Sequence, residues 1–214
     1  MNPAALAHLR KRCPVMRRLI RLHEPCLIVP DTRRSPFEAL VSAVAHQQLH
    51  GKAAETILGR FRALFTPARF PQPHHLASVT DDALRACGFS RAKTAAIRDI
   101  AEKTLSGVVP TSRAIARMSD EEIIARLTAV RGVGRWTVEM LLIFKLARPD
   151  VLPADDFGVR NGLRVAFKLP ALPTPKEVLA RGEPWRPHAT TAAWYLWRAA
   201  DAAPPRKAAA KAKG

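Results

Sequence analysis

Helix-start motifs recur along this chain, and they constrain its fold more than any other feature. Residues 35–38 (SPFE), 119–122 (SDEE) and 174–177 (TPKE) each place a Ser or Thr three positions before a glutamate. In such a capping box the hydroxyl oxygen accepts the third helical N–H, and the glutamate returns to the N-cap N–H. Proline after the hydroxyl, present in two of the three motifs, is suited to the first helical position. Strand patterns are nearly absent, so the sequence predicts an all-α protein.

The predicted helices are separated by short stretches rich in Gly, Pro or Asn. Apolar spacing and the helix-start motifs place them at 3–12, 14–22, 36–46, 52–65, 81–86, 91–105, 113–117, 120–128, 135–147, 157–167, 175–181 and 188–201. We interpret Cys26–Val29, before Pro30, as a short extended piece. Residues 1–203 are expected to form one compact domain of two packed helical lobes, and the Ala/Lys-rich residues 204–214 a disordered basic tail.

The chain is strongly basic. It carries 35 Lys and Arg against 18 Asp and Glu, a formal net charge of +17. Residues 201–214 hold four basic residues and one acid, which contribute +3, so +14 belongs to residues 1–200. A field of this sign attracts polyanions, which favours a nucleic-acid partner. Association with ribosomes is the alternative that charge alone leaves open.

The cysteines and the apolar runs exclude several classes of protein. Cys13, Cys26 and Cys87 are an odd number without a CxxC pair, which argues against a disulfide framework, a zinc ribbon or a four-cysteine iron–sulfur cluster. No apolar run approaches the roughly 20 residues of a membrane span, and basic residues interrupt the N-terminus where a signal peptide would be apolar. We therefore expect no membrane association and a reducing, DNA-containing compartment.

A short helix, a tight loop and a second helix are predicted over residues 127–140. Gly132 and Gly134 flank Val133 in the loop, where glycine permits positive φ and leaves backbone N–H groups exposed. Exposed N–H groups at a helix N-terminus bind a phosphate without reading sequence. This segment therefore predicts a phosphate-binding hairpin, and a plain helix–turn–helix packing element is the alternative.

Other residues of the hairpin fit the same interpretation. Val130 and Val133 are expected to point inward, while Arg131 and Arg135 add charge. A dinucleotide-binding loop is disfavoured, because it requires a preceding strand and a third glycine. The predicted DNA contacts of the hairpin are Arg131, Gly132, Val133, Gly134, Arg135 and Thr137.

Two acids, Asp155 and Asp156, follow Pro153 and precede an apolar helix. One interpretation is an ordinary helix N-cap. The other is a catalytic carboxylate, because breaking an N-glycosidic bond builds positive charge on the sugar that a carboxylate stabilises. A chain so rich in Lys and Arg has little reason to place acids toward DNA unless they take part in chemistry.

The run LTAVRGVGRWTVEM followed by LPADDFGVRNG resembles the helix-hairpin-helix DNA glycosylases, and within them the 3-methyladenine DNA glycosylase II branch. The resemblance extends from about Phe37 to Trp197. It implies a two-lobed all-α glycosylase fold with the active site in a cleft between the lobes, and Asp156 rather than Asp155 as the catalytic carboxylate. Some relatives carry an extra N-terminal β-domain, which we expect this chain to lack.

Position 136 bears on the type of reaction. Relatives that also cut the DNA backbone carry a lysine there, whose amine forms a Schiff base with the sugar. This chain has Trp136, so the resemblance implies a monofunctional enzyme that uses water and leaves an abasic site. No cofactor or metal is expected, apart from an optional monovalent cation at the hairpin.

The segment 46–52 (HQQLHGK) lies between two predicted helices. Its two histidines have zinc-ligand spacing, but no third ligand or general-base glutamate accompanies them; a polar loop without a role is a further alternative. The resemblance implies that this loop enters the minor groove and fills the gap left by a flipped nucleotide. Gln48 is the preferred plug and Gln47 or Leu49 the alternates. The predicted contacts are Gln47, Gln48, Leu49, His50 and Lys52.

The flipped base needs a lining, for which Trp136 and Met140 share a helix face. An indole attracts cations, and N3- or N7-alkylated purines are cationic; the alternative is that Trp136 is a core residue. His188, where relatives often have an aromatic residue, either closes this pocket or contacts phosphate, and Phe37 completes the predicted substrate-binding set.

Further residues are assigned more simply. Ser90 and Lys93 resemble a second phosphate contact at a helix start, with an ordinary interhelix turn as the alternative, and Trp194, Tyr195 and Trp197 are interpreted as core.

The sequence thus predicts a monomeric, monofunctional DNA glycosylase that removes alkylated purines of the 3-methyladenine type from duplex DNA during base excision repair. Its compartment would be the cytoplasm and nucleoid of a bacterium or the nucleus of a eukaryote. A non-catalytic module that binds damaged DNA is the alternative, and Asp156 distinguishes the two.

Overall fold

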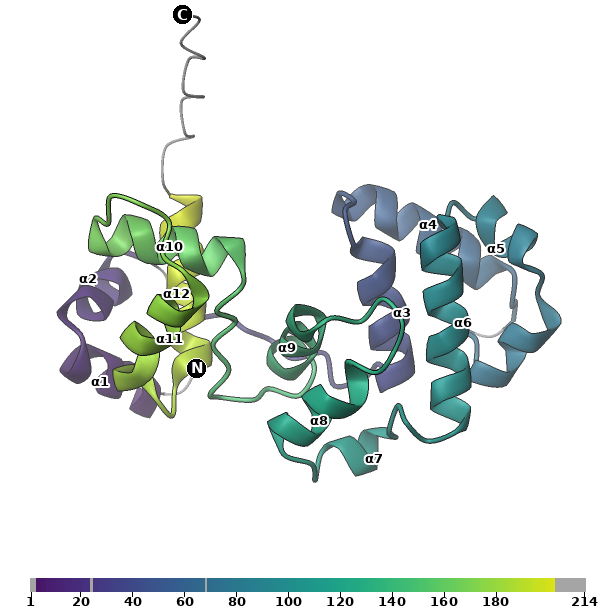
Figure 1. The fold of residues 1–214 in the computed structure, drawn as a ribbon, viewed down its shortest axis with the longest axis horizontal. Helices are drawn as coiled ribbons and strands as arrows, with labels where there is room; N and C mark the ends of the chain where they lie inside the picture. The colour runs from purple at the N-terminus through teal and green to yellow at the C-terminus, as the bar shows by residue number, and fades with distance from the viewer. Residues whose placement is uncertain (1–2, 24, 68, 203–214) are drawn as a thin grey trace, which may run out of the picture. The chain divides into compact units, whose positions relative to one another are not determined.

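The computed structural model describes residues 3–23, 25–67 and 69–202. Within these ranges every regular element is an α-helix or a 3₁₀ helix, which confirms the all-α prediction (Figure 1). The tail predicted at 204–214 lies outside the described residues. No helix among the described residues has the length and apolar character needed to cross a membrane.

The chain divides into two compact units. Unit 1 combines Met1–Ile28 with Arg148–Gly214, and unit 2 is the continuous segment Val29–Ala147. Unit 1 therefore draws on both ends of the chain, whereas unit 2 is formed by its middle.

Unit 2 holds eight of the described helices, and its core lies between α3 and α6, which run side by side (Figure 1). Leu40 and Val41 of α3, Phe61 of α4, and Ile97 and Ile100 of α6 are fully buried there. The elements are α3 (Pro36–His46), α4 (Gly51–Ala63), η1 (Pro73–Ser78), α5 (Asp81–Ala86), α6 (Arg91–Leu105), α7 (Ser112–Ile115), α8 (Asp120–Leu127) and α9 (Arg135–Phe144).

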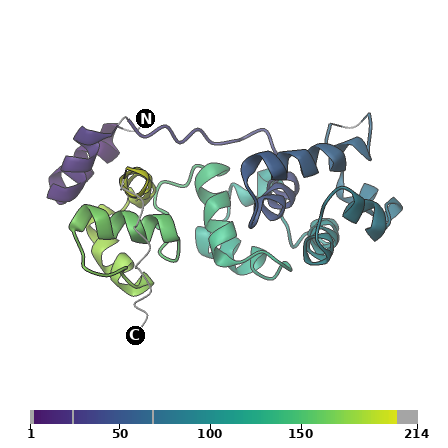
Figure 2. The same ribbon diagram turned by 90° about the horizontal axis from the view of Figure 1, so that it is seen from above.

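Unit 1 is organised around α10 and α12, which lie against each other in both views (Figures 1 and 2). Gly162 permits this contact, because a Cβ at that position would overlap the carbonyl of Leu196. Trp185 and Tyr195 are the largest buried side chains of its core. The elements are α1 (Pro3–Arg12), α2 (Pro14–Leu22), α10 (Phe157–Phe167), α11 (Pro175–Gly182), η2 (Glu183–Trp185) and α12 (Ala189–Asp201).

Helix boundaries follow the local sequence closely. The helices predicted at 36–46, 91–105 and 157–167 begin and end as expected. The helix predicted to reach residue 147 stops at Phe144, because Ala147 adopts a left-handed φ of 55° that an α-helix cannot continue. The 3₁₀ helices η1 and η2 were not predicted. Cys26–Val29 is irregular rather than a strand, since the described residues offer it no partner strand.

Two of the three capping boxes form completely. Ser119 with Glu122 and Thr174 with Glu177 exchange both hydrogen bonds. At α3 the hydroxyl of Ser35 accepts the N–H of Glu38, but the Glu38 carboxylate lies 4.0 Å from Arg34 instead of returning to the cap. The helix begins where predicted all the same.

Candidate functional site

The hairpin joins α8 to α9 in unit 2. Val130 and Val133 are buried, which confirms that they point inward. Gly132 has a φ of 75°, in the left-handed region that favours glycine, whereas Gly134 is extended with a φ of −88°. The expectation that glycine is needed for positive φ therefore holds at Gly132 alone.

The hairpin N–H groups divide into engaged and available ones. The N–H of Val133 donates to the carbonyl of Val130 at 3.1 Å, and the N–H of Arg131 donates to Asp99 Oδ2 at 2.7 Å. These two groups are thus already satisfied. The N–H groups of Gly132 in the loop and of Gly134 and Arg135 at the start of α9 have no acceptor within the described residues, so these groups carry the phosphate-binding capacity of the backbone.

The two hairpin arginines differ in their surroundings. Both are exposed, but Arg135 Nε lies 3.0 Å from Glu139 Oε1, on the buried side chain one turn further along α9. Arg131 has no ion pair within the described part of the chain. Arg131 does act electrostatically on Asp99, and it helps to lower the pKa of that carboxyl.

The loop after α3 exposes the residues predicted to enter DNA. Gln48 has a left-handed φ of 58°, which costs a non-glycine residue about 1–3 kcal/mol and is typical of functional positions. Gln48, Leu49 and His50 are exposed, as is Lys52 in the first turn of α4. Leu49 is 40% exposed.

Gln47 has a different arrangement from its neighbours. Its side chain is half-buried, and Nε2 donates to the carbonyl of Gly132 at 3.0 Å. Gln47 thus ties the loop after α3 to the hairpin, which fits a supporting role better than that of an alternate plug.

Lys93 also serves as a support. Its Nζ donates to the carbonyls of Ala45 at 2.9 Å and Gln47 at 2.7 Å, at the C-terminal end of α3, and burial lowers the pKa of this amine. The expected phosphate contact is corrected accordingly, because the ammonium is turned into the protein. Ser90 is exposed, but its hydroxyl accepts the N–H of Lys93 at 3.3 Å as the N-cap of α6.

Helix α6 supports the hairpin as well as the loop. Lys103 donates to Asp99 Oδ2 at 2.8 Å and to the carbonyl of Ala129 at 2.7 Å. Burial alone raises the pKa of Asp99, but the hydrogen bonds from Lys103 and Arg131 outweigh it and leave that pKa lowered. We call Lys93, Asp99 and Lys103 the α6 bracket, since through them one helix holds both the loop after α3 and the hairpin.

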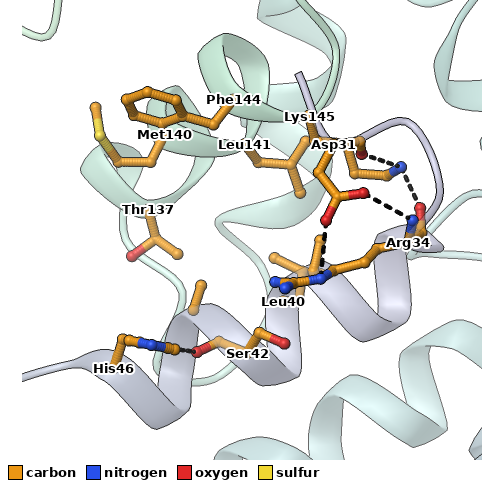
Figure 3. Close-up of a pocket in the computed structure, with 12 residues that line it drawn as sticks. Asp31, Arg34, Leu40, Ser42, His46, Thr137, Met140, Leu141, Phe144 and Lys145 are labelled. Atoms are coloured by element: carbon orange, nitrogen blue, oxygen red, sulfur yellow. Dashed lines mark hydrogen bonds and ion pairs between the residues drawn. The ribbon is translucent and has the colours of Figure 1, made fainter. Parts of the chain in front are cut away.

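A cavity of about 220 Å³ lies between α3 and α9 (Figure 3). Its lining is mostly apolar. Thr137, predicted to contact DNA, is buried and lines this cavity instead, and Met140 of the predicted base pocket lies beside it. The lining residues are Asp31, Arg34, Ala39, Leu40, Ser42, Ala43, His46, Thr137, Met140, Leu141, Phe144 and Lys145.

One end of the cavity is charged. Lys145 donates to the carbonyls of Asp31 and Arg34, and Arg34 Nε lies 2.9 Å from Asp31 Oδ2 (Figure 3). Burial lowers the pKa of Lys145, although Asp31 and Glu38 oppose that effect. This cluster could not be predicted from the sequence, because Lys145 is 114 and 111 positions away from Asp31 and Arg34.

The other predicted base-pocket residues lie apart from this lining. Phe37 is only 3% exposed and packs against Phe70 at a ring distance of 6.1 Å, so it is a core residue and its predicted substrate contact finds no support. Trp136 is 44% exposed at the start of α9, so it is not the core residue that an isolated tryptophan usually is.

In unit 1, Asp156 is the N-cap of α10. Its Oδ1 accepts the N–H of Val159 at 2.7 Å, so the capping interpretation is confirmed. The same oxygen accepts the indole N–H of Trp197 at 2.7 Å. Asp155 is exposed. Asp156 is thus the more firmly held acid, and capping leaves its catalytic role open.

The remaining aromatic residues of unit 1 need one correction. Tyr195 is buried as expected, but Trp194 and Trp197 are half-buried, Trp194 with Arg198 over its ring at 5.3 Å. His188 caps the start of α12, and its ring meets that of His8 edge-on at 5.3 Å.

Comparison with known proteins assigns the chain to a lineage. A family model described as HhH-GPD superfamily base excision DNA repair protein matches residues 41–187. DNA-3-methyladenine glycosylase 1 of Schizosaccharomyces pombe is 49% identical over 78% of this chain and 73% of its own length. The alkylbase DNA glycosidase-like protein mag2 of the same yeast is 35% identical, over 84% of this chain and 85% of its own.

Solved structures agree. The 3-methyladenine DNA glycosylase of S. pombe in complex with abasic DNA matches with a TM-score of 0.81 and 44% identity, over 91% of this chain and 95% of that one. A DNA-3-methyladenine glycosidase of Bacillus halodurans matches with a TM-score of 0.81 and 32% identity, over 94% and 90%.

Proposed function

The chain belongs to the HhH-GPD superfamily of base excision DNA repair proteins, and from that membership we propose that it is a monofunctional glycosylase for alkylated purines. It would flip a 3-methyladenine-type base out of duplex DNA and hydrolyse the N-glycosidic bond. The similarity to 3-methyladenine glycosylases in both sequence and fold carries this proposal.

Unit 2 would bind the damaged strand. The available N–H groups at the start of α9, together with Arg131, would hold a phosphate. Gln48, which has a left-handed backbone conformation, would fill the gap left by the flipped nucleotide. Leu49 and His50 would lie beside it in the minor groove. Lys52 would add a phosphate contact.

The cavity between α3 and α9 would receive the base. Met140, Leu141 and Phe144 supply an apolar wall. Trp136 is not part of the lining, but its exposed ring at the start of α9 would offer a face that attracts a cationic purine. A positively charged base is already a good leaving group. A permissive pocket without a strong general acid therefore suits alkylated purines.

Asp156 in unit 1 would supply the catalytic carboxylate. As the glycosidic bond breaks, the sugar gains oxocarbenium character, and a fixed carboxylate stabilises that charge and orients the attacking water. The water oxygen bonds to the anomeric carbon and releases one proton to solvent, while the cationic base leaves as a neutral purine with the electron pair of the glycosidic bond; an abasic site remains.

We propose that this reaction needs no resident cofactor. Three cysteines cannot supply the four thiolates of an iron–sulfur cluster, and a monovalent cation at the hairpin is an optional addition. The enzyme would act as a monomer in the nucleoid of a bacterium or the nucleus of a eukaryote.

Lys145 is the amine that bears on lyase activity. It lines the cavity, but its Nζ is engaged by the two backbone carbonyls, so we propose that it forms no Schiff base. Borohydride added during turnover should trap no covalent DNA adduct. An adduct that disappears in Lys145→Met would make the enzyme bifunctional.

The test of the proposed function is direct. Incubation with duplex DNA treated with a methylating agent, followed by mass analysis of the released bases, should yield 3-methyladenine and related purines. Asp156→Asn should keep DNA affinity and lose base release by roughly 100-fold or more. Binding without any base release by the unmodified protein would indicate a non-catalytic module, and release of uracil or 8-oxoguanine would contradict the substrate class.

A further inference from the structure

Trp197 is placed where it can act on the reaction through Asp156. It lies on α12, half-buried against the core of unit 1, and its Nε1–H donates to Asp156 Oδ1 at 2.7 Å. The N–H of Val159 donates to the same oxygen at 2.7 Å. One carboxylate oxygen therefore takes two donors, from two helices, and together they restrict rotation of the carboxylate group.

The close contact between ring and carboxylate depends on Gly158. A Cβ there would lie 2.8 Å from Trp197 Cδ1, 3.0 Å from Asp156 Oδ1 and 3.2 Å from Trp197 Nε1. Any larger residue would occupy the space in which the indole meets the acid. Gly162, one turn later, lets the two helices approach closely enough for this contact.

An N-cap alone does not require this arrangement. Asp156 already satisfies the start of α10 through Val159, and a cap of this kind is worth about 0.5–2 kcal/mol without any second donor. The indole adds a charge-assisted hydrogen bond to the oxygen that the cap has already engaged. The indole N–H of Trp197 therefore adds control over the orientation of the Asp156 carboxylate.

We propose that Trp197 is a positioning residue for the catalytic carboxylate, which its N–H holds in one orientation toward the sugar. This inference rests on the proposed function, and specifically on the role of Asp156. Small displacements of a catalytic group are costly, about 100-fold in rate for 1 Å. Loss of the indole N–H should thus slow the chemical step while DNA binding, which depends on other residues, is kept.

The test compares two tryptophans of α12. Trp197→Phe keeps an aromatic ring and removes the N–H; Trp194→Phe is the matched control, since Trp194 is also half-buried and packs on Arg198 rather than on Asp156. We expect single-turnover base release to fall roughly 10- to 100-fold in Trp197→Phe, with unchanged affinity for DNA that carries an abasic-site analogue. Trp194→Phe should stay near the wild-type rate.

A second variant removes the N–H without changing shape. Replacing Trp197 with benzothienylalanine, in which sulfur stands in place of N–H, keeps the ring volume and should reproduce the slow rate at an unchanged melting temperature. Gly158→Ala should slow base release in the same direction by displacing the indole.

The outcomes separate the two proposals. If Asp156→Asn is inactive but the benzothienylalanine variant releases base at the wild-type rate, the positioning role of Trp197 is wrong and the proposed function stands. If Asp156→Asn remains active, the catalytic assignment itself fails. Equal losses of rate and of DNA affinity in Trp197→Phe and Trp194→Phe would reduce Trp197 to a structural residue.

Discussion

The two units fix their functional residues by opposite means. In unit 2 the two loops that we propose bind DNA are held by the charged side chains of the α6 bracket, which reach to backbone groups of the loop after α3 and of the hairpin. In unit 1, Asp156 is held by direct helix packing. Gly158 and Gly162 of α10 let α12 approach closely enough for the indole of Trp197 to reach Asp156 at the start of α10.

The difference matches the tasks that we propose for the two regions. A loop that inserts into a duplex has to adjust to the backbone it meets, and a flexible lysine can keep its hydrogen bonds while carbonyls shift slightly. A carboxylate that stabilises a cation has to stay in place, because preorganisation is what lowers the barrier. The variants below test this contrast, starting with the largest expected effect.

Gly162→Ala should disrupt unit 1 most strongly. A methyl group there would overlap the Leu196 carbonyl, which belongs to a helix backbone and cannot turn away. We expect a loss of about 3 kcal/mol in the free energy of unfolding, measured by urea denaturation. The control is Gly134→Ala in unit 2, where a Cβ meets nothing within 4 Å and φ is −88°; a similar loss there would show that the effect at Gly162 does not come from the overlap with the Leu196 carbonyl.

Lys93→Met should loosen the loop after α3. The carbonyls of Ala45 and Gln47 lose their donor, and such loss costs about 1–3 kcal/mol. Base flipping, followed by 2-aminopurine fluorescence beside the lesion, should weaken more than DNA binding does. Full flipping in this variant would show that the bracket does not position the plug.

Asp99→Asn tests the hairpin side of the bracket through pH. The pKa of Asp99 is lowered in the folded protein, so its contribution to stability is complete above the unfolded carboxyl value of about 3.9 and disappears as pH falls through the lower folded value. The variant should therefore be less stable than the wild type at pH 7, and urea denaturation should show this difference shrinking as pH falls below about 3.9. The control is Asp82→Asn: the Asp82 carboxylate is 92% exposed, so this variant should differ little from the wild type in stability at any pH. If both variants showed the same pH dependence of stability, Asp99 would not be the group that holds the hairpin.

Lys52→Ala should have the smallest effect. An exposed lysine that contacts a phosphate lowers affinity uniformly across sequences, and its removal reduces the salt slope of binding by about 1. The rate of base release at saturating enzyme should not change. A slower chemical step would mean that Lys52 supports the loop, like Lys93, rather than binding the DNA backbone.

Local features of this fold could be predicted and distant ones could not. The helix starts at Ser119 and Thr174 depend on residues three positions apart, so the sequence contains the whole interaction. Burial of Val130 and Val133 could be predicted for the same reason, because both valines lie within the short hairpin itself. Phe37 and Thr137 were misplaced because burial depends on which helices pack together, which no single motif encodes.

The supports of the candidate site were the hardest to anticipate. Trp197 and Asp156 are 41 positions apart, and Gln47 and Gly132 are 85 apart. A usable indication did exist in Gly158 and Gly162, since glycines inside a helical pattern usually have a packing or functional reason. Their spacing of one helical turn points to a close neighbour, although not to which one.

The discontinuous make-up of unit 1 has a consequence for the order of biosynthesis. Unit 2 is a continuous segment, so a ribosome releases all of it before α10 and α12 have been made, and domains generally fold as units in the order they emerge. The helices α1 and α2, although synthesised first, must wait for their partners at the far end of the chain. The environment of Asp156 is therefore completed after unit 2, so a nascent chain forms the loops that we propose bind DNA before it forms the surroundings of the proposed catalytic acid.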